Sequence, residues 1–278
     1  MLGYVCKYTP MELFEAMDTE ITRLEPSVTD FNHADTLMHA NICSYTKAVL
    51  EDVMEHDYEG VILTTCCDSI RRLYDTLKSQ FPDKFFFLLD IPRKFNDFAV
   101  TLYERQLKQM LTEYEAFSGK TLDLKRFVSM MQNKAALKKQ ENTRMSASAA
   151  SEKGNGQKLN IGIMGARCNN EIRQLLVDRG ANLLFDLTCT GLAPDFSITE
   201  DQVLHSYAAA LLNQIPCMRM LKAANREHFL DGFTDRLDGI IYHTVKFCDS
   251  YSYEYAKIAI LKHIRNYSLL QKREMLLN

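Results

Sequence analysis

The tripeptide Cys-Asp-Ser occurs twice in this chain of 278 residues, and each copy stands between a short apolar run and a helix-like segment. The first copy begins at Cys67 after Val61-Ile-Leu-Thr-Thr65, and the second begins at Cys248 after Gly239-Ile-Ile-Tyr242. Short apolar runs that alternate with helical segments are typical of parallel strands in an α/β fold. The repeat therefore predicts two similar α/β units, each with a cysteine at the end of a strand.

The position of these two cysteines favours a reactive thiol. The carboxyl ends of parallel strands form the crevice in which ligands bind, and the next helix offers free N–H groups and the positive end of its dipole. Asp68 and Asp249 are suitable N-cap residues, which would put Cys67 and Cys248 just outside the first helical turn. A cysteine there usually has a lowered pKa, and the thiolate is the form that binds metal.

Two further cysteines stand just ahead of an expected helix. Residues 2–6 are expected to form a short strand, and Thr9 as N-cap, Pro10 at the first helical position and Glu12 form a good helix start, so Cys6 precedes a helix. Ser44 is a plausible N-cap for a helix through about residue 54, which puts Cys43 in the same kind of position.

A change in composition divides the chain. Residues 85–89 are expected to form another buried strand, and residues 99–140 have the apolar spacing of helices. Residues 138–158 contain few apolar residues and many Ser, Gly and charged residues, which is typical of a flexible linker. The sequence therefore predicts an N-terminal domain over 1–137 with a helical extension, a linker over 138–158, and a C-terminal domain over 159–278.

The second half repeats the α/β pattern. Strands are expected over 159–164, 181–186 and 239–242, with helices over 169–179, 202–212 and 253–264, and a charged helical end over 269–278. Gly162 and Gly165 follow the first of these strands without the third glycine of the dinucleotide fingerprint. A nicotinamide site is therefore not expected.

Composition excludes some classes of partner. Lys and Arg total 33 against 36 acidic residues, so a net charge of -3 gives no basic surface for nucleic acid and no polybasic membrane patch. The start lacks the basic and apolar segments of a secretion signal, and no apolar run is long enough to span a membrane, which predicts a cytoplasmic protein. Eight cysteines in such a chain are reduced thiols, metal ligands or small buried side chains rather than a disulfide framework.

The cysteine motifs, taken in order, resemble those of a known family. The signatures of the 2-hydroxyacyl-CoA dehydratase family, to which benzoyl-CoA reductase subunits belong, are similar to Cys43-Ser-Tyr-Thr-Lys47, Thr65-Cys-Cys-Asp68, Leu89-Asp-Ile-Pro-Arg93 and Lys246-Phe-Cys-Asp249. Supporting matches are Gly3-Tyr-Val-Cys-Lys-Tyr-Thr-Pro-Met-Glu12, Asp186-Leu-Thr-Cys-Thr-Gly191 and Ile215-Pro-Cys-Met-Arg219. These matches keep the order of the family across nearly the whole chain.

The resemblance implies a fold and a cofactor. It implies two flavodoxin-like parallel-sheet α/β domains, joined by a helical segment and a flexible linker, with a 4Fe-4S cluster between them. Carried over by motif, the iron ligands are Cys43, Cys67 and Cys248. Three thiolates on a four-iron cluster leave one iron with a position for chemistry rather than for electron storage alone.

The resemblance also implies a reaction and partners. It implies a hydro-lyase in which one electron reaches the thioester carbonyl of a 2-hydroxyacyl-CoA, a ketyl radical forms, and loss of water gives an enoyl-CoA. Family members pair with a homologous subunit and receive the electron from a separate ATP-hydrolysing iron-sulfur activator. The acyl group stays unassigned, because no residue is attributed to its side-chain pocket.

Two alternatives within this resemblance stay open. Typical members continue well beyond the Lys-Phe-Cys-Asp motif, whereas this sequence ends 30 positions (278 − 248) after Cys248, which is compatible with a noncatalytic electron-relay or partner subunit. Double-cubane proteins resemble the dehydratases but carry a larger cluster for the ATP-dependent reduction of small molecules. Their additional ligands would come from surplus cysteines, for which the candidates are Cys6, Cys168, Cys189 and Cys217.

Other residues have a structural and a functional interpretation. Alternation along an extended strand would point Cys66 away from Cys67, so Cys66 is interpreted as structural. His39 lies one helical turn before Cys43 and suggests a zinc site, although a surface or capping role is the simpler interpretation. Asp68 and Asp249 could steer protons, but helix capping is the simpler interpretation. Arg93 and Arg219 could bind CoA phosphates or form ion pairs with carboxylates inside the fold.

Overall fold

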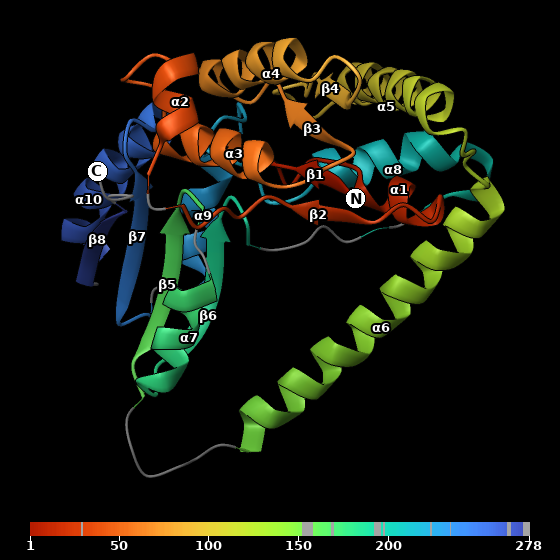
Figure 1. Cartoon of the computed structure of the whole chain (residues 1–278). Coiled ribbons are helices and arrows are strands. Elements are labelled where there is room, and N and C mark those ends of the chain that lie inside the picture. Colours follow the sequence, from red (N-terminus) through yellow and green to blue (C-terminus); the bar gives the residue numbers. More distant parts are fainter. Residues whose placement is uncertain are drawn as a thin grey trace.

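The computed structural model describes residues 1–28, 30–151, 158–167, 170–191, 196, 198–222, 224–233, 235–265 and 268–274. These residues form two four-stranded sheets in which every strand pairing is parallel (Figure 1). The strand orders are β2-β1-β3-β4 and β6-β5-β7-β8. The expected α/β fold class, with two flavodoxin-like domains, is confirmed.

The first sheet is built from β1 (Leu2–Tyr4), β2 (Ile21–Arg23), β3 (Gly60–Thr64) and β4 (Phe85–Leu89). All of β3 is buried, as its apolar sequence predicts for a strand covered on both faces.

Helices cover both faces of the first sheet. One face packs on α3 (Ser44–Glu55) and α4 (Asp68–Gln80). The other packs on α1 (Met11–Ala16), α5 (Asp97–Ser118) and the start of α6 (Leu124–Ser151), while the short α2 (Asn32–Leu37) adjoins α3.

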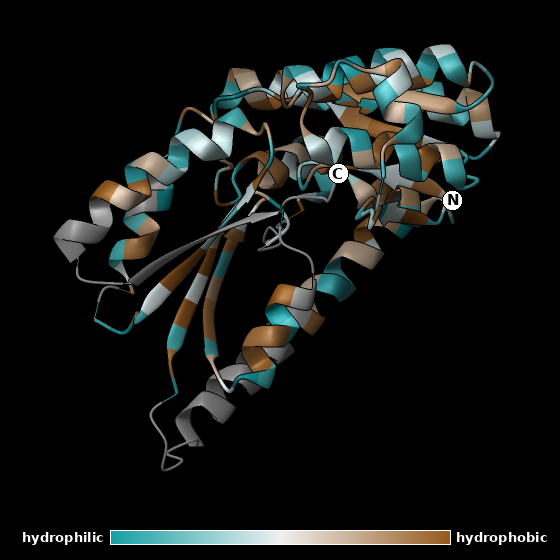
Figure 2. Cartoon of the chain, turned by 60° about the vertical axis from the view of Figure 1, so that its left-hand side comes forward, coloured by the Kyte–Doolittle hydropathy of each residue, from teal (hydrophilic) through white to brown (hydrophobic). Residues whose placement is uncertain are grey.

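The second sheet contains β5 (Asn160–Gly165), β6 (Asn182–Thr188), β7 (Gly239–Val245) and β8 (Ser268–Glu274). One core includes Leu230 of α9 (Ala224–Asp231) and Tyr251 and Ile258 of α10 (Asp249–Arg265). A smaller core lies under α7 (Asn170–Asp178). Figure 2 shows the hydrophobic residues gathered along the strands and the hydrophilic residues on the outer sides of the helices.

One helix of the second half packs into the core of the first half. After a 3-10 turn (Glu200–Gln202), α8 (Val203–Leu212) lies beside α5, and its Tyr207 and Leu211 are fully buried in the core of the first sheet. The Tyr207 hydroxyl donates a hydrogen bond to the carboxylate of Glu12 at 2.5 Å. The two halves therefore share a core as well as the loops between them.

Two sequence predictions of secondary structure are wrong. Helix α6 continues to Ser151, so residues 138–151 of the predicted linker are helical, and residues 152–157 lie outside the described residues. The predicted charged helix over 269–278 is strand β8 as far as Glu274, because pairing with β7 satisfies its backbone groups; the last four residues are not described.

The described helices do not meet the requirements of a membrane-spanning segment. None of those in the described part of the chain combines the length and the apolar character that a membrane-spanning segment needs.

Candidate functional site

A cavity of about 120 Å³ lies where the carboxyl ends of both sheets meet. Loops that follow β1, β3, β5, β6 and β7 contribute to its wall, together with the loop after α8. The cysteines that line it come from both halves of the chain: Cys6, Cys43, Cys66, Cys67, Cys189, Cys217 and Cys248. They are free thiols, and each is partly buried.

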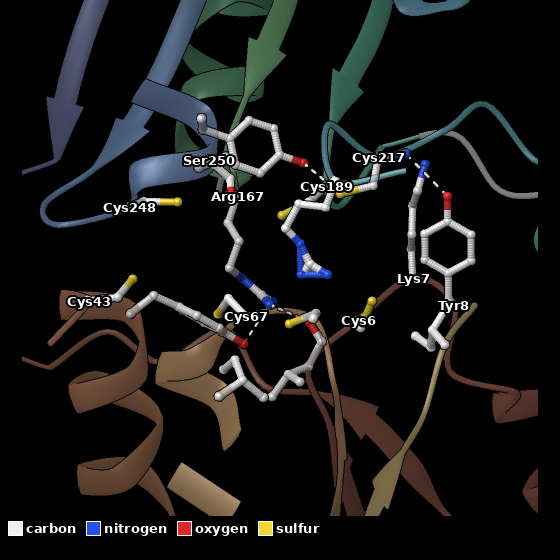
Figure 3. A pocket seen from close by; sticks show the side chains of 18 of the residues that line it. Cys6, Lys7, Tyr8, Cys43, Cys67, Arg167, Cys189, Cys217, Cys248 and Ser250 are labelled. Carbon is white, nitrogen blue, oxygen red and sulfur yellow. Dashed lines mark hydrogen bonds between the residues drawn. The ribbon is translucent and has the colours of Figure 1, made fainter. Parts of the chain in front are cut away.

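Cys43, Cys67 and Cys248, called here the ligand group, stand at the starts of three helices. Cys43 and Cys67 are the N-cap residues of α3 and α4, and Cys248 directly precedes α10 (Figure 3). Because the first helical N–H groups have no partner inside the helix, each sulfur faces donors and the positive end of a helix dipole. Each of the three thiols therefore reaches the cavity from the start of a helix.

Hydrogen bonds between thiols lower the pKa of Cys43 and Cys67 and raise the pKa of Cys248. The Cys248 S–H donates to Cys43, which lowers the pKa of Cys43 against the opposing effect of burial. The same bond, together with burial, raises the pKa of Cys248. The S–H of Cys66 donates to Cys67 and lowers the pKa of that thiol, with a further contribution from the backbone N–H of Ile70. Cys43 and Cys67 are thus the thiols prepared to lose a proton.

Cys6, Cys189 and Cys217, called here the second group, occupy another part of the same cavity. Figure 3 shows them on the side of the cavity near Lys7 and Tyr8, away from Cys43 and Cys248. Burial raises the pKa of Cys6 to about 11 and that of Cys189 to about 12. Burial therefore favours the protonated form of Cys6 and Cys189 until a metal replaces the proton.

Tyr251 and Tyr8 hold Cys217. The sulfur of Cys217 lies 3.5 Å from the hydroxyl of Tyr251, the third residue of α10, and the backbone N–H of Cys217 donates to the hydroxyl of Tyr8 at 3.1 Å. The backbone N–H of Tyr251 also acts on the sulfur of Cys248. The first turn of α10 therefore connects the two groups of cysteines.

The charged side chains that line the cavity are all cationic. They are Lys7, Arg93, Arg167 and Arg219, and no Asp, Glu or His is among the described residues that line the cavity. A buried charge is costly unless it is paired, so such a lining favours a negatively charged occupant.

Arg167 joins the two halves at this wall. It follows β5, and its guanidinium donates to the backbone oxygens of Val5 at 3.0 Å and Leu24 at 2.6 Å. It also donates to the hydroxyl of Tyr45 and lies 4.1 Å from the centre of that ring. The first half therefore meets the second half through an arginine that is already saturated with acceptors.

A buried ion pair fixes the loop that carries Cys217. Arg226 donates to the backbone oxygen of Pro216 at 3.2 Å and to Glu254 of α10 at 2.5 Å, and both of these charged side chains are almost fully buried. The hydroxyl of Tyr242 adds a third contact to Glu254 at 2.6 Å. The loop and α10 are thus held at a defined separation.

The comparison with protein families matches residues 6–144 and 129–266 to the 2-hydroxyglutaryl-CoA dehydratase, D-component. The two matched segments each contain one of the parallel sheets for the most part. The chain belongs to this family.

The dehydratase D-component family is generally associated with iron-sulfur clusters and acts in multi-component enzymes, which agrees with a dehydratase-type role for this chain within a complex. No curated protein matches the sequence. In the described part of the chain, no three His, Cys, Asp or Glu side chains form a group that could hold a single metal ion. A 4Fe-4S cluster differs from such an ion because each cysteine binds a different iron.

The interpretation of Cys66 as a thiol on the opposite face is wrong. Strand β3 ends at Thr64, so Cys66 lies in a turn where strand alternation no longer applies. Its side chain lines the cavity and contacts the thiol of Cys67. Burial and that contact raise the pKa of Cys66 well above its ordinary value.

The helix starts lie one residue from their predicted positions. The cysteines themselves hold the cap positions of α3 and α4, so Ser44 and Asp68 are the first helical residues. Asp68 and Asp249 are exposed and do not line the cavity, which leaves proton steering without support. Thr9 is not a side-chain cap either, because the cap position of α1 is occupied by Pro10.

The remaining candidates separate by position. His39 is exposed, accepts a hydrogen bond from the backbone N–H of Asn41 and does not line the cavity, so the zinc arrangement is not formed. Arg93 and Arg219 do line it. Cys168 lies outside the described residues. Lys7 and Arg167 were missed in the sequence, although both sit two or three residues after a strand, the only signal that could have identified them.

Proposed function

We propose that this chain is the iron-sulfur component of a 2-hydroxyacyl-CoA dehydratase-type enzyme, with Cys43, Cys67 and Cys248 as ligands of a 4Fe-4S cluster. The observation that carries the proposal is the convergence of three helix-capping cysteines, from both sheets, on one cavity. A division of the chain into domains over 1–137 and 159–278, joined by residues 138–158, belongs to the same proposal.

The residues present suit such a cluster. Thiolates are its usual protein ligands, and hydrogen bonds lower the pKa of two of the three thiols, Cys43 and Cys67. The cationic lining offsets the negative charge that thiolates and inorganic sulfide bring together. The apolar side chains of Val5, Ile70 and Met220 also line the cavity and limit the access of water.

A 4Fe-4S cluster held by Cys43, Cys67 and Cys248 would supply one-electron transfer and Lewis acidity toward a thioester carbonyl. The protein would bind the 2-hydroxyacyl-CoA next to the cluster. It would also exclude bulk solvent from the cavity while the substrate loses water to give the enoyl-CoA. Arg167 and Tyr45 serve this by holding the two halves together at the wall of the cavity.

The proposal includes partners and a compartment. The electron comes from an ATP-dependent iron-sulfur activator, and a homologous dehydratase subunit completes the enzyme as a hetero- or homodimer. No nucleic acid or membrane takes part, and the reduced thiols are suited to the cytoplasm. A chain that only relays the electron to the subunit that binds acyl-CoA is the variant of this proposal without catalysis.

A single-turnover assay tests the proposal. The anaerobic chain, its partner subunit and the activator with ATP are mixed with a panel of 2-hydroxyacyl-CoAs, and enoyl-CoA is quantified. Formation of enoyl-CoA that depends on this chain supports the proposal, and the C67S variant serves as the matched control. Equal turnover by the partner and activator alone would contradict the proposal, because neither a catalytic chain nor an electron relay would then be required.

The second group of cysteines favours another candidate function. Cys6, Cys189 and Cys217 line the same cavity as the ligand group and provide further thiols for a larger cluster of the double-cubane type. Such a chain would be an ATP-dependent reductase of small molecules rather than a dehydratase. Iron analysis separates the two: about four iron atoms per chain, retained in C6S, C189S and C217S, supports the dehydratase, and about twice that content, reduced in those variants, supports the reductase.

A further inference from the structure

Arg219 differs from the other cations of the cavity wall. Lys7 donates to the backbone oxygen of Ile215 at 2.6 Å, and Arg167 is saturated with acceptors from the first half. Arg93 is exposed to solvent. Arg219 is partly buried, and its Nε is fully buried without a hydrogen-bond acceptor.

The surroundings of Arg219 hold thiols instead of carboxylates. None of the ion pairs found among the described residues involves Arg219. Burial disfavours its charge, but the thiols of Cys66, Cys217, Cys6 and Cys67 together raise the pKa of its guanidinium above the ordinary value. The internal ion-pair interpretation of this arginine is therefore wrong.

Arg219 acts on both groups of cysteines. Its charge lowers the pKa of Cys67 in the ligand group and of Cys6 in the second group. Lys7, by contrast, interacts with Cys217, Cys6 and Cys189 of the second group. Arg219 thus lines the cavity that both groups of cysteines share, where a metal-sulfur occupant would lie.

A buried guanidinium without a counter-ion costs several kcal/mol. A buried N–H donor on a side chain that lines a thiol-lined cavity can be satisfied by a negatively charged sulfur. Hydrogen bonds to cluster sulfurs and nearby positive charge raise a cluster's reduction potential. We infer that Arg219 is a positioning residue that donates its Nε–H to a sulfur of the bound cluster and raises its reduction potential. This inference rests on the proposed iron-sulfur function and concerns how easily the cluster accepts its electron.

The test compares R219Q and R219K with wild type and with R71Q. Arg71 is exposed on α4, one turn after Cys67, so R71Q removes the same charge where solvent screens it. Iron and sulfide are quantified first, and the midpoint potential is then measured in an anaerobic titration followed by electron paramagnetic resonance. The expected result is full cluster content with a more negative potential in R219Q, a smaller shift in R219K, and no shift in R71Q.

The results for R219Q, R219K and wild type test the role of Arg219 separately from the iron-sulfur function on which that role rests. An unchanged potential in R219Q at full cluster content overturns the role of Arg219 and leaves the iron-sulfur proposal standing. Cluster loss in R219Q that R219K restores supports the role, because lysine keeps the charge, whereas loss in both variants overturns it. Wild-type chain without iron or sulfide overturns the proposed function and the inference with it.

Discussion

The two halves of this chain share a strand order but differ in some of the residues at the ends of equivalent strands. In each half the third strand of the chain segment, β3 or β7, leads into a cysteine and then a helix. Two residues after β1 stands Cys6, whereas two residues after the equivalent β5 stands Arg167. The ends of β3 and β7 carry the proposed ligands Cys67 and Cys248. The end of β1 carries the thiol of Cys6, whereas the end of β5 carries Arg167, which contacts the other half.

This difference shows which part of the repeat serves the cavity. A parallel sheet provides strand ends at one edge in both halves, and the side chains placed there decide the chemistry. Variants at equivalent and non-equivalent positions therefore test this difference between the halves.

The largest loss of stability is expected at the buried ion pair of the second half. E254Q leaves Arg226 without its counter-ion, which costs about 3–5 kcal/mol of unfolding free energy. Urea denaturation measures this cost. The double variant R226M/E254M is the control, because it removes both charges and should recover much of the loss; a cost below about 1 kcal/mol for E254Q would contradict the importance of the pair.

The next effect is expected at the end of β5. Gly165 has a φ of 104°, and a Cβ there would lie 2.1 Å from the backbone oxygen of His243. G165A should therefore cost about 2 kcal/mol or more. G232A is the matched control, since the nearest atom to its Cβ would be at an ordinary 3.6 Å. Equal stability of the two variants in thermal unfolding would refute this strain.

A smaller effect is expected from the contact between the halves. R167Q removes the charged donor from the backbone oxygens of Val5 and Leu24, which should cost about 1.5–3 kcal/mol. Cys6 at the equivalent position of the first half has no such bonds, so C6A should cost less. Urea denaturation of both variants tests the comparison, and a larger loss for C6A would reverse it.

The smallest effect concerns the reactivity of the metal-free thiols. Since Cys248 donates its proton toward Cys43, Cys43 should be carboxymethylated at lower pH than Cys248, and the rate should rise as pH rises through the lowered pKa of Cys43. Peptide mass spectrometry after iodoacetate treatment at several pH values measures the order. In C248A the Cys43 rate profile should move to higher pH; modification of Cys248 first would show that the proton lies on the other sulfur.

Much of the fold follows from the sequence because local signals and tertiary structure agree. Apolar runs such as residues 61–65 and 85–89 predict β3 and β4 within one residue, and the cysteines at strand ends do meet in one cavity. Parallel sheets make this possible, since their carboxyl ends share an edge.

Other features depend on contacts that local patterns do not contain. Residues 268–274 end in three consecutive charged residues and were predicted to be helical, yet they form a strand because the edge of β7 offers backbone partners. Residues 138–151 have a linker composition but continue a helix that begins in the core. Cys66 enters the cavity because the strand stops two residues earlier than alternation assumes.

The cationic wall was the least predictable part of the site. Lys7, Arg167 and Arg219 lie far apart in the sequence and meet only because both sheets direct their loops to the same place. No spacing rule connects them, so the sequence indicated the thiols and, from their motifs, Arg93 and Arg219, but it missed Lys7 and Arg167.

Anaerobic iron and sulfide analysis of wild type, C67S and C248S tests the central claim that equivalent strand ends of the two halves hold one cluster together. C66S is the matched control, because Cys66 adjoins Cys67 and lines the same cavity without being a proposed ligand. We expect about four iron atoms per wild-type chain, a similar content in C66S, and loss of most iron and sulfide in both C67S and C248S. Full retention of the cluster in C67S and C248S would show that these two cysteines do not hold it.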